Sequence, residues 1–255
     1  MTDSTRHKSR FQKLVTALRN TRVVNTGVLF EYWEIEHLRR LLPYLDVDCV
    51  FDVGANVGQY GRMLRERVGY TGRIVSFEPY PEAAGRLAAA AAGDLSWTVR
   101  EEAIAAEDGS QVFNVMAESQ FNSLGVPRHD EVDLFESQNS VASSIEVRTR
   151  SLDSVFAELK DEFGFERPFL KLDTQGFDVT IIEAANASLG EFVGLQSELA
   201  VRKIYDQSVD YRDALRLYER LGFTLSALVP NNAGHFPVMV ETDCIMVRTD
   251  LIADV

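Results

Sequence analysis

Two carboxylates, Asp52 and Glu78, each follow a short apolar run that predicts a buried strand. Asp52 leads at once into a turn that carries Gly54, Asn56 and Gly58. Two adjacent parallel strands of a nucleotide-binding sheet present their ends in this way. The glycines let a ligand lie against bare backbone, and Glu78 can accept hydrogen bonds from a ribose diol. The pattern therefore predicts a nucleoside-binding site at these two strand ends.

The spacing of the glycines indicates which nucleotide fits. A dinucleotide fingerprint needs glycines at 54, 56 and 59, whereas this chain has Gly54, Asn56 and Gln59. The middle glycine of that fingerprint lets the backbone touch a pyrophosphate, so an asparagine in its place disfavours NAD. The pattern Asp-x-Gly-x-Asn-x-Gly instead resembles the one that Rossmann-like methyltransferases use for S-adenosylmethionine, which has no phosphate. The amino-acid end of that molecule suits an acidic, amide-lined pocket, and its ribose suits Glu78.

A second group of polar residues lies in the segment 169–178, Phe-Leu-Lys-Leu-Asp-Thr-Gln-Gly-Phe-Asp. Strand alternation places Lys171 and Asp173 on one face, with Asp173 at the strand end, where open α/β sheets bind ligands. Asp173 is therefore the leading candidate for a base beside the donor pocket. A lysine within an apolar strand is costly unless it is paired. Lys171 either forms a buried ion pair with a carboxylate such as Asp173, or holds or helps to deprotonate a substrate.

Glu198 ends the next predicted strand in the same way. It contacts a substrate, orients a base, binds a metal, or is a solvated strand end. With Asp173, Asp178 and Asp206 it would form an acidic rim, which suits hydroxyl-rich ligands and also Mg²⁺. No spacing in the chain has the sharpness of a metal motif, so we predict no metal ligands and keep Mg²⁺ as an alternative cofactor only.

Two other places carry candidate residues. Glu102 and Ala103 follow the third predicted strand, where this fold has its contacts to an adenine ring, and the alternative is an ordinary loop. His235 lies in a glycine-bearing loop before the last predicted strand. A neutral imidazole there would serve as a general base near pH 7. The alternative for His235 is a surface position in that loop.

Alternating strand and helix patterns must position these residues, and the alternation predicts a parallel sheet. An inserted antiparallel hairpin interrupts it at about 110–116 and 144–150, and a closing antiparallel pair follows at 223–229 and 243–248. Pro43 is expected to end the second N-terminal helix. The predicted helices are 11–20, 30–42, 57–68, 82–92, 151–163, 177–187 and 209–220, and the other strands are 49–53, 73–78, 96–100, 169–173 and 192–199.

Size and charge narrow the class of protein. With 255 residues the chain can form one well-buried α/β domain, so we predict a helical extension at 1–47 and a Rossmann-like domain at 48–255 within one compact unit. The net charge of −13 disfavours a nucleic-acid binder, because phosphate contacts need clustered cations. No apolar run has the length of a membrane span and no secretory signal is visible, so we expect a cytoplasmic protein. Cys49 and Cys244 are expected to be buried thiols.

In this order the motifs resemble those of the FkbM family of methyltransferases. Each motif is modest by itself, but their order over residues 48–248 is specific. The matching stretches are Phe-Asp-Val-Gly-Ala-Asn-Val-Gly at 51–58, Phe-Glu-Pro at 77–79, Glu-Asp-Gly at 107–109, Arg-Ser-Leu-Asp at 150–153, Lys-Leu-Asp-Thr-Gln-Gly-Phe-Asp at 171–178 and Asp-Cys-Ile-Met-Val-Arg at 243–248.

The resemblance implies a Rossmann-like class I methyltransferase fold: α/β, with a mostly parallel sheet, an antiparallel C-terminal strand, N-terminal helices and an inserted β-hairpin. It implies transfer of a methyl group from S-adenosylmethionine to a hydroxyl of a sugar or of a glycosylated or polyketide-type natural product. Carried over by position, Asp52, Gly54, Asn56 and Gly58 line the methionine end of the donor, and Glu78 contacts its ribose.

One position departs from the family. Gln175 stands where the family often has Glu, and the lost charge argues against an acid or base role there. Our hypothesis makes Asp173 the base or the group that orients it, with Lys171, Glu198 and His235 as helpers. Two other classes compete: a nicotinamide-dependent oxidoreductase, disfavoured by the missing glycine, and a non-catalytic nucleotide-binding module, disfavoured because the donor motif is intact. The identity of the small-molecule acceptor and the oligomeric state have no readable signal.

Overall fold

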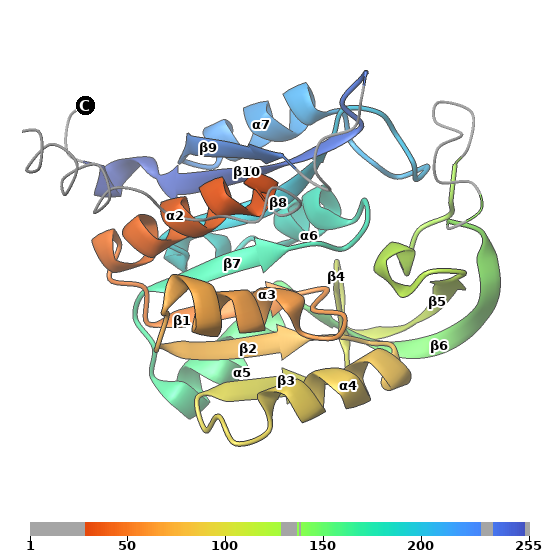
Figure 1. Ribbon diagram of the computed structural model, residues 1–255, viewed down its shortest axis with the longest axis horizontal. Coiled ribbons are helices and arrows are strands. Elements are labelled where there is room, and N and C mark those ends of the chain that lie inside the picture. The colour runs from red at the N-terminus through yellow and green to blue at the C-terminus, as the bar shows by residue number, and fades with distance from the viewer. Residues whose placement is uncertain (1–28, 129–136, 138, 231–236, 253–255) are drawn as a thin grey trace, which may run out of the picture.

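The computed structural model describes residues 29–128, 137, 139–230 and 237–252. Its centre is a seven-stranded sheet in the order β3-β2-β1-β7-β8-β10-β9, which crosses the middle of the molecule in Figure 1. The last strand of the chain lies between β8 and β9 and runs antiparallel to both. The strands are β1 (Cys49–Val53), β2 (Arg73–Phe77), β3 (Trp97–Arg100), β7 (Pro168–Leu172) and β8 (Gly194–Ala200), all parallel, with β9 (Phe223–Pro230) and β10 (Glu241–Arg248).

The central strands are apolar because both faces of the sheet are covered. Every residue of β1 is buried, and successive side chains point to opposite faces. Val50 therefore packs into the core on one face and Phe51 into the core on the other. The ring of Phe51 lies 5.3–6.1 Å, between centroids, from the rings of Phe77, Phe156 and Phe192. This packing fixes the strand whose end carries Asp52.

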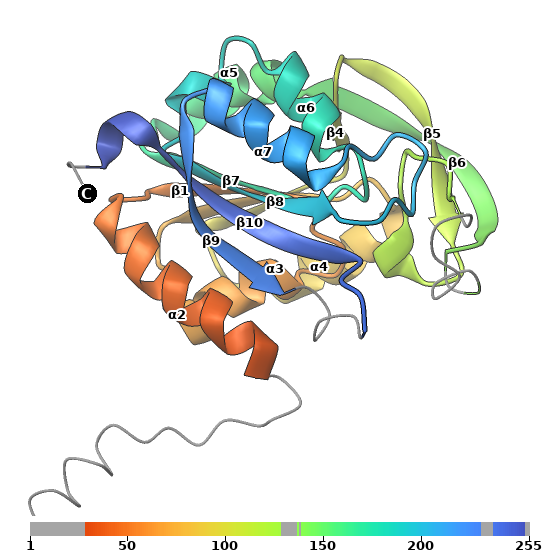
Figure 2. The same ribbon diagram turned by 90° about the horizontal axis from the view of Figure 1, so that it is seen from above.

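Helices cover both faces, as Figure 2 shows from above. On one face lie α2 (Leu29–Tyr44), α3 (Gln59–Met63) with its π-helical continuation η2 (Leu64–Val68), and α4 (Pro81–Ala91). On the other lie α5 (Leu152–Phe163), α6 (Asp178–Ala184) and α7 (Tyr211–Arg220). A short 3-10 turn, η4 (Leu189–Glu191), precedes β8, and another, η5 (Thr249–Leu251), follows β10. No helix within the described part of the chain is long and apolar enough to cross a membrane.

A second sheet of three strands follows β3. Its order is β4 (Ala103–Ala105), β6 (Val141–Ser151) and β5 (Gly109–Met116), with β5 antiparallel and β4 parallel to β6. In Figure 1 it curves around the side toward which the parallel strands point. The turn η3 (Ser119–Phe121) follows β5. The second sheet therefore stands beside the carboxyl ends of the central strands, where this class of sheet binds ligands.

The predicted fold class is confirmed in its main features: the mostly parallel sheet, the antiparallel C-terminal strand, an N-terminal helix on the sheet and the inserted hairpin. The predicted helix 11–20 lies outside the described residues. The short strand β4 was not predicted, because its three residues read as a loop. The division of the chain at residue 48 stays a prediction, and α2 contributes Leu38 and Leu42 to the same core as β1 and β2.

Two predicted helix boundaries are wrong. Pro43 lies inside α2, which ends at Tyr44. In the last turn a proline removes only one backbone hydrogen bond, so the helix continues past it. The predicted helix 57–68 begins at Gln59 and is not uniform. Gly69 donates its backbone N–H to the carbonyl of Leu64, five residues earlier, so the segment ends in a π-helical turn.

Candidate active site

A cavity of about 480 Å³ opens at the carboxyl ends of the central strands. Its lining comes from the turns after β1, β2 and β7, from β8 and β10, from α2 and α3, and from residues 113–124 of the inserted segment. Lys171 on β7 and Asp173, directly after β7, lie between two groups of lining residues. Asp52, Gly54, Asn56 and Glu78 form what we name the β1–β2 wall, and Glu198, Glu241 and Asp243 form the β8–β10 wall.

The β1–β2 wall begins at Gly54, where the chain turns with a φ of +78° and passes close to the end of β7. A Cβ atom on this residue would lie 2.0 Å from the carbonyl oxygen of Asp173. The turn therefore needs glycine for its left-handed conformation and for this contact. The same contact places Asp173 directly beside the glycine turn.

Glu78 holds that turn in place. Its Oε2 accepts the backbone N–H of Asn56 at 2.8 Å, and its Oε1 accepts that of Tyr80 at 2.9 Å. Burial raises the pKa of Glu78 to about 7, against the pull of these two N–H groups. Carboxylate oxygens can each accept a second hydrogen bond, so Glu78 retains capacity for ligand hydroxyls. Oδ1 of Asn56 is buried without a hydrogen-bond partner in the described structure, so a ligand donor would satisfy it.

Asp52 lies deeper in the same wall and is held by a short chain of hydrogen bonds. Its Oδ2 accepts a 2.7 Å bond from Ser76 Oγ, which in turn accepts one from Nε1 of Trp97 at 2.9 Å. Burial raises the pKa of Asp52 to about 6, and the bond from Ser76 opposes that rise. The strand register sets Asp52 opposite Lys171 on β7. The wall therefore keeps its carboxylates buried but hydrogen-bonded.

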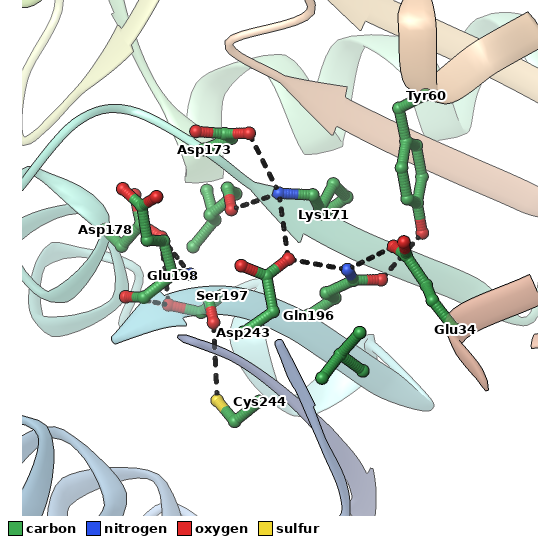
Figure 3. A network of polar contacts seen from close by, with 12 residues as sticks. Glu34, Tyr60, Lys171, Asp173, Asp178, Gln196, Ser197, Glu198, Asp243 and Cys244 are labelled. Atoms are coloured by element: carbon green, nitrogen blue, oxygen red, sulfur yellow. Dashed lines mark hydrogen bonds and ion pairs between the residues drawn. The ribbon is translucent and has the colours of Figure 1, made fainter. Parts of the chain in front are cut away.

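Lys171 is the buried cation of the site, 4% exposed (Figure 3). Its Nζ donates to the carbonyl of Leu172 at 3.0 Å and lies 3.3 Å from Oδ2 of Asp173 and 3.7 Å from Oδ2 of Asp243. Burial alone would lower the pKa of Lys171, but the two carboxylates more than offset it and the pKa is raised. Of the two sequence interpretations of Lys171, the buried ion pair with Asp173 is therefore present.

Gln196 joins Asp243 of the β8–β10 wall to Glu34 on α2, as Figure 3 shows. Its Nε2 donates to Oε1 of Glu34 and to Oδ2 of Asp243, both at 2.7 Å, and its Oε1 accepts the hydroxyl of Tyr60 at 3.0 Å. Burial raises the pKa of Glu34 to about 7, with Asp243 as the next cause. One buried amide therefore fixes three groups from α2, α3 and β10.

Gln175 links Asp173, Glu198 and Tyr205 on another side of the cavity. Its Nε2 donates to Asp173 at 3.1 Å and to Glu198 at 3.2 Å, while its Oε1 accepts the hydroxyl of Tyr205 at 3.0 Å. Ser123, in the inserted segment, donates its hydroxyl to the backbone carbonyl of Gln175 at 2.9 Å. The residue holds a φ of 54°, which costs a non-glycine residue energy and indicates that its neighbours fix it. A neutral amide here orients two carboxylates without adding a charge.

The β8–β10 wall has less compensation. Burial, followed by Glu241 and Asp173, raises the pKa of Glu198 well above its usual value. Burial, followed by Asp173 and Asp243, raises the pKa of Glu241 to about 8. Glu241 is 5% exposed, lines the cavity and has no hydrogen bond or ion pair with the described residues. A buried carboxylate without a partner resists ionisation. Glu198 and Glu241 therefore keep their protons to higher pH than Asp52 and Glu78 of the β1–β2 wall.

Residues 52–225 match the family model of the Methyltransferase FkbM domain. The chain belongs to the FkbM methyltransferase family. No curated protein matches the chain.

The solved structures that are similar to this chain have low sequence identity to it. The FkbM methyltransferase of Methylobacillus flagellatus KT is 15% identical with a TM-score of 0.48, and the match covers 79% of this chain and 44% of that one. Aeropyrum pernix fibrillarin with natively bound S-adenosyl-L-methionine is 13% identical, with a TM-score of 0.46 and coverage of 85% and 74%. An O-methyltransferase from Bacillus cereus in complex with SAH is 12% identical, with a TM-score of 0.44 and coverage of 93% and 88%. This chain thus spans less than half the length of the Methylobacillus protein.

Most of the residues predicted to bind the donor line the cavity. Asp52, Gly54, Asn56, Glu78 and Ala103 are among the lining residues, which brings the predicted donor motif together. Their role in binding stays a prediction.

Two predicted donor residues are not among the lining residues. Gly58 turns with a φ of +85° and faces the core, where an added Cβ would lie 2.9 Å from Cδ1 of Leu87. Glu102 is buried and forms ion pairs with Arg100 at 3.1 Å and Arg148 at 3.4 Å. Ala103, the first residue of β4, lines the cavity, whereas Glu102 directly before it does not.

The predicted catalytic residues Asp173, Lys171 and Glu198 meet around the cavity, and His235 lies outside the described residues. Their catalytic roles stay predictions.

The predicted acidic rim is only partly formed. Asp178 is buried and structural: it accepts the N–H of Thr174 at 3.0 Å, the hydroxyl of Ser197 at 2.9 Å and the N–H of Glu198 at 3.0 Å. Asp206 is exposed and is not among the lining residues. In the described ranges no group of three or more histidine, cysteine or acidic side chains has the arrangement of a metal site.

Sequence reasoning missed the partners that come from distant segments: Glu34, Tyr60, Gln196, Glu241 and Asp243. A signal was present for two of them. Glu241 and Asp243 are two residues apart at the start of the last strand, which sets both on one face. The predicted strand began at 243 and therefore left out Glu241.

Proposed function

We propose that this protein transfers a methyl group from S-adenosylmethionine to a hydroxyl of a sugar or of a glycosylated or polyketide-type natural product. The position of Asp173 carries the proposal. Its backbone carbonyl packs on the glycine turn, and its side chain, 43% exposed, lines the cavity between the two walls. A carboxylate beside the donor turn and open to the cavity suits a proton acceptor for a neutral hydroxyl.

The β1–β2 wall fits S-adenosylmethionine. Glu78 has free acceptor capacity for a ribose diol, and the buried Oδ1 of Asn56 lacks a donor that an ammonium would supply. Apolar surface for an adenine ring comes from Phe77, Ala103 and Ile104, which line the same end of the cavity. When bound, this cofactor supplies a methyl group that its sulfonium already makes electrophilic. The protein therefore has to align the acceptor, exclude water and remove one proton.

The proton of the acceptor hydroxyl passes to the carboxylate of Asp173 as the oxygen is methylated. The ammonium of Lys171 lies 3.3 Å from Oδ2 of Asp173 and holds this carboxylate in place beside the glycine turn. Gln175 is a positioning residue, because its amide holds Asp173 and Glu198 in one orientation. The network around Lys171 and Gln196 keeps the floor of the cavity rigid.

Calorimetric titration with S-adenosylhomocysteine tests the donor site, with NAD as the competing ligand. Wild-type protein should bind S-adenosylhomocysteine with a dissociation constant on the order of micromolar. Asp52→Ala and Glu78→Ala should abolish that binding. Glu82→Ala is the matched control, because Glu82 is exposed on α4 and pairs only with Arg86 and Tyr80.

The outcomes separate the classes of function. Loss of binding in both wall variants but not in the control supports the donor site. Binding of NAD without S-adenosylhomocysteine would establish the oxidoreductase. Binding of neither ligand would favour a degenerate module and contradict the proposal.

A further inference from the structure

In the β8–β10 wall, Glu198 and Asp243 each accept a hydrogen bond from a glutamine. Glu241 has no hydrogen bond or ion pair with any residue that the structure describes. Its side chain is 95% buried, since 5% is exposed, and it lines the cavity. Burying a carboxylate is costly unless a cation or a hydrogen-bond donor compensates it. Lys171 does not serve, because it is already paired with Asp173 and Asp243. Glu241 therefore faces the cavity with its hydrogen-bonding capacity available to a ligand.

The position of Glu241 separates it from the donor motif. β10 is three strands away from β1 in the sheet, with β7 and β8 between them. Neighbouring strands lie roughly 4.8 Å apart, so β1 and β10, which carries Glu241, are separated by about 14 Å. Glu78, on β2, lies one strand farther still. A ligand seated on the glycine turn and on Glu78 thus leaves Glu241 to the second substrate.

The charge of the cavity lining also favours a cationic ligand beside Glu241. Nine carboxylates and three cations line it, so an anionic acceptor would meet a strongly negative surface. Of the cations, Arg67 pairs with Glu31 and Lys171 is paired as described above. A cationic acceptor would compensate the ionised form of Glu241, which a neutral acceptor would not do.

We propose that the acceptor carries a protonated amine beside the hydroxyl that is methylated, and that Glu241, with Glu198, binds this ammonium. The substrate class is then an amino sugar or a similar hydroxylated amine. This inference rests on the proposed methyl transfer, because it assigns the second substrate of that reaction. An ammonium has three N–H donors, enough for both carboxylates of the wall.

Proton release gives the binding a second signature. The titratable groups that face Glu241, among the described residues, are Glu198 on β8, Asp173 after β7, Asp178 on α6, Asp243 on β10 and Tyr205. They are carboxyls and a phenol, so Glu241 holds a proton at pH 7, consistent with its pKa of about 8. An ammonium seated against it lowers that pKa, so binding at pH 7 should release up to one proton to the buffer. A neutral ligand should release none.

The test is calorimetry on the full chain saturated with S-adenosylhomocysteine, in phosphate and in HEPES at pH 7. The probes are the methyl glycosides of glucosamine and galactosamine and the aminocyclitol 2-deoxystreptamine, each beside its N-acetylated form. We expect at least one amine to bind with proton release, and its N-acetylated form to bind at least tenfold more weakly. Glu241→Gln and Glu198→Gln should each weaken the amine about tenfold and leave the affinity for S-adenosylhomocysteine unchanged. Glu219→Gln, on the exposed surface of α7, is the matched control.

Three results would overturn the inference. They are no amine bound to the loaded protein, an N-acetylated form bound as tightly as its amine, or a loss of S-adenosylhomocysteine binding in a folded Glu241→Gln protein. The last result would assign Glu241 to the cofactor. If wild-type protein binds no S-adenosylhomocysteine, the proposed function fails first and the inference fails with it. Thermal unfolding of each variant establishes that it is folded.

Discussion

The β1–β2 wall and the β8–β10 wall both bury carboxylates at strand ends, but they compensate them differently. In the first wall, Glu78 accepts two backbone N–H groups and Asp52 accepts a serine hydroxyl, all from residues 52–80. In the second, Asp243 shares a lysine and a glutamine, and Glu241 has no partner in the described structure. The first wall lacks only hydrogen bonds from a ligand, as the unpartnered Oδ1 of Asn56 indicates. The second is short of positive charge.

The difference teaches how one cavity holds two unlike ligands. A wall made of one turn and two neighbouring strands has its own backbone donors nearby, so its geometry is fixed before any ligand binds. A wall made of β8 and the last strand has few such donors, so its charge state depends on what enters the cavity. We expect the first to determine affinity for the donor and the second to determine which acceptor is used.

The largest effect should come from Gly54→Ala, which breaks the contact between the β1–β2 wall and β7. The added Cβ would lie 2.0 Å from the carbonyl oxygen of Asp173 at a φ of +78°. The turn must move, and a displacement of about 1 Å in such a site costs on the order of 100-fold. Calorimetry should show no measurable S-adenosylhomocysteine binding. Gly69→Ala is the control: its φ is +82° with no atom within 4 Å, so it should lose roughly 1–2 kcal/mol of stability and keep full binding.

Asp173→Asn should separate chemistry from donor binding. The amide keeps the shape of the side chain but cannot accept the proton, so turnover should fall about 100-fold or more. Affinity for S-adenosylhomocysteine should stay nearly the same, because the backbone carbonyl of Asp173, not its side chain, packs on Gly54. Steady-state kinetics beside calorimetry measures both. Unchanged turnover would show that Asp173 is not the base.

Glu78→Gln should reduce donor affinity by a smaller factor and so test the role of the β1–β2 wall. The amide can accept only one of the two N–H groups of Asn56 and Tyr80, and its NH₂ faces the other. A lost charged hydrogen bond of this kind costs about 1.5–3 kcal/mol, which is roughly 10- to 100-fold in donor affinity. Binding of an amine acceptor to protein saturated with donor product should not change. An equal loss for both ligands would mean that the two walls are not independent.

Glu241→Gln should change stability with a distinctive dependence on pH. Its folded-state pKa of about 8 lies above the usual value of about 4.3, so the folded wild type binds more protons than the unfolded chain. The stability linked to this group is therefore complete below about pH 4 and is lost as the pH rises toward 8. Glutamine has no such loss. We expect the variant to gain about 1 kcal/mol over wild type at pH 5, growing to about 4 kcal/mol at pH 8, and thermal unfolding across that range measures it.

A gain that does not grow with pH would contradict the assignment of a buried, protonated Glu241. Glu183→Gln serves as the control, because Glu183 is exposed on α6 and should show no such trend.

The same contrast explains how much of the molecule could be predicted from its sequence. The turn at Gly54 and the carboxylate Glu78 belong to contiguous motifs, whose local conformation and strand ends suffice to bring them together. Lys171 and Asp173 share one strand, so their ion pair follows from alternation alone. The parallel alternation of strands and helices predicted the sheet for the same local reason.

The β8–β10 wall depends on the order of strands, which no local pattern encodes. The last strand inserts between β8 and β9, and its register with β8 sets Asp243 opposite Glu198. That register brings Glu241 to the cavity and lets Gln196 reach Glu34 on α2, 162 residues away in sequence. For Asp178 the sequence prediction was wrong in the opposite sense, because it placed at the cavity a residue that is structural. Asp178 was predicted in the acidic rim, but as the first residue of α6 it accepts hydrogen bonds from four donors of its own surroundings.

A crystal structure of the complex with S-adenosylhomocysteine tests the division of the cavity most directly. The measured quantities are the distances from the ligand to the carboxylates of Glu78 and Glu241. We predict ribose hydroxyls within about 3 Å of Glu78 and no ligand nitrogen within hydrogen-bond distance of Glu241. An ammonium of the ligand seated on Glu241, or a ribose away from Glu78, would contradict the two-wall account.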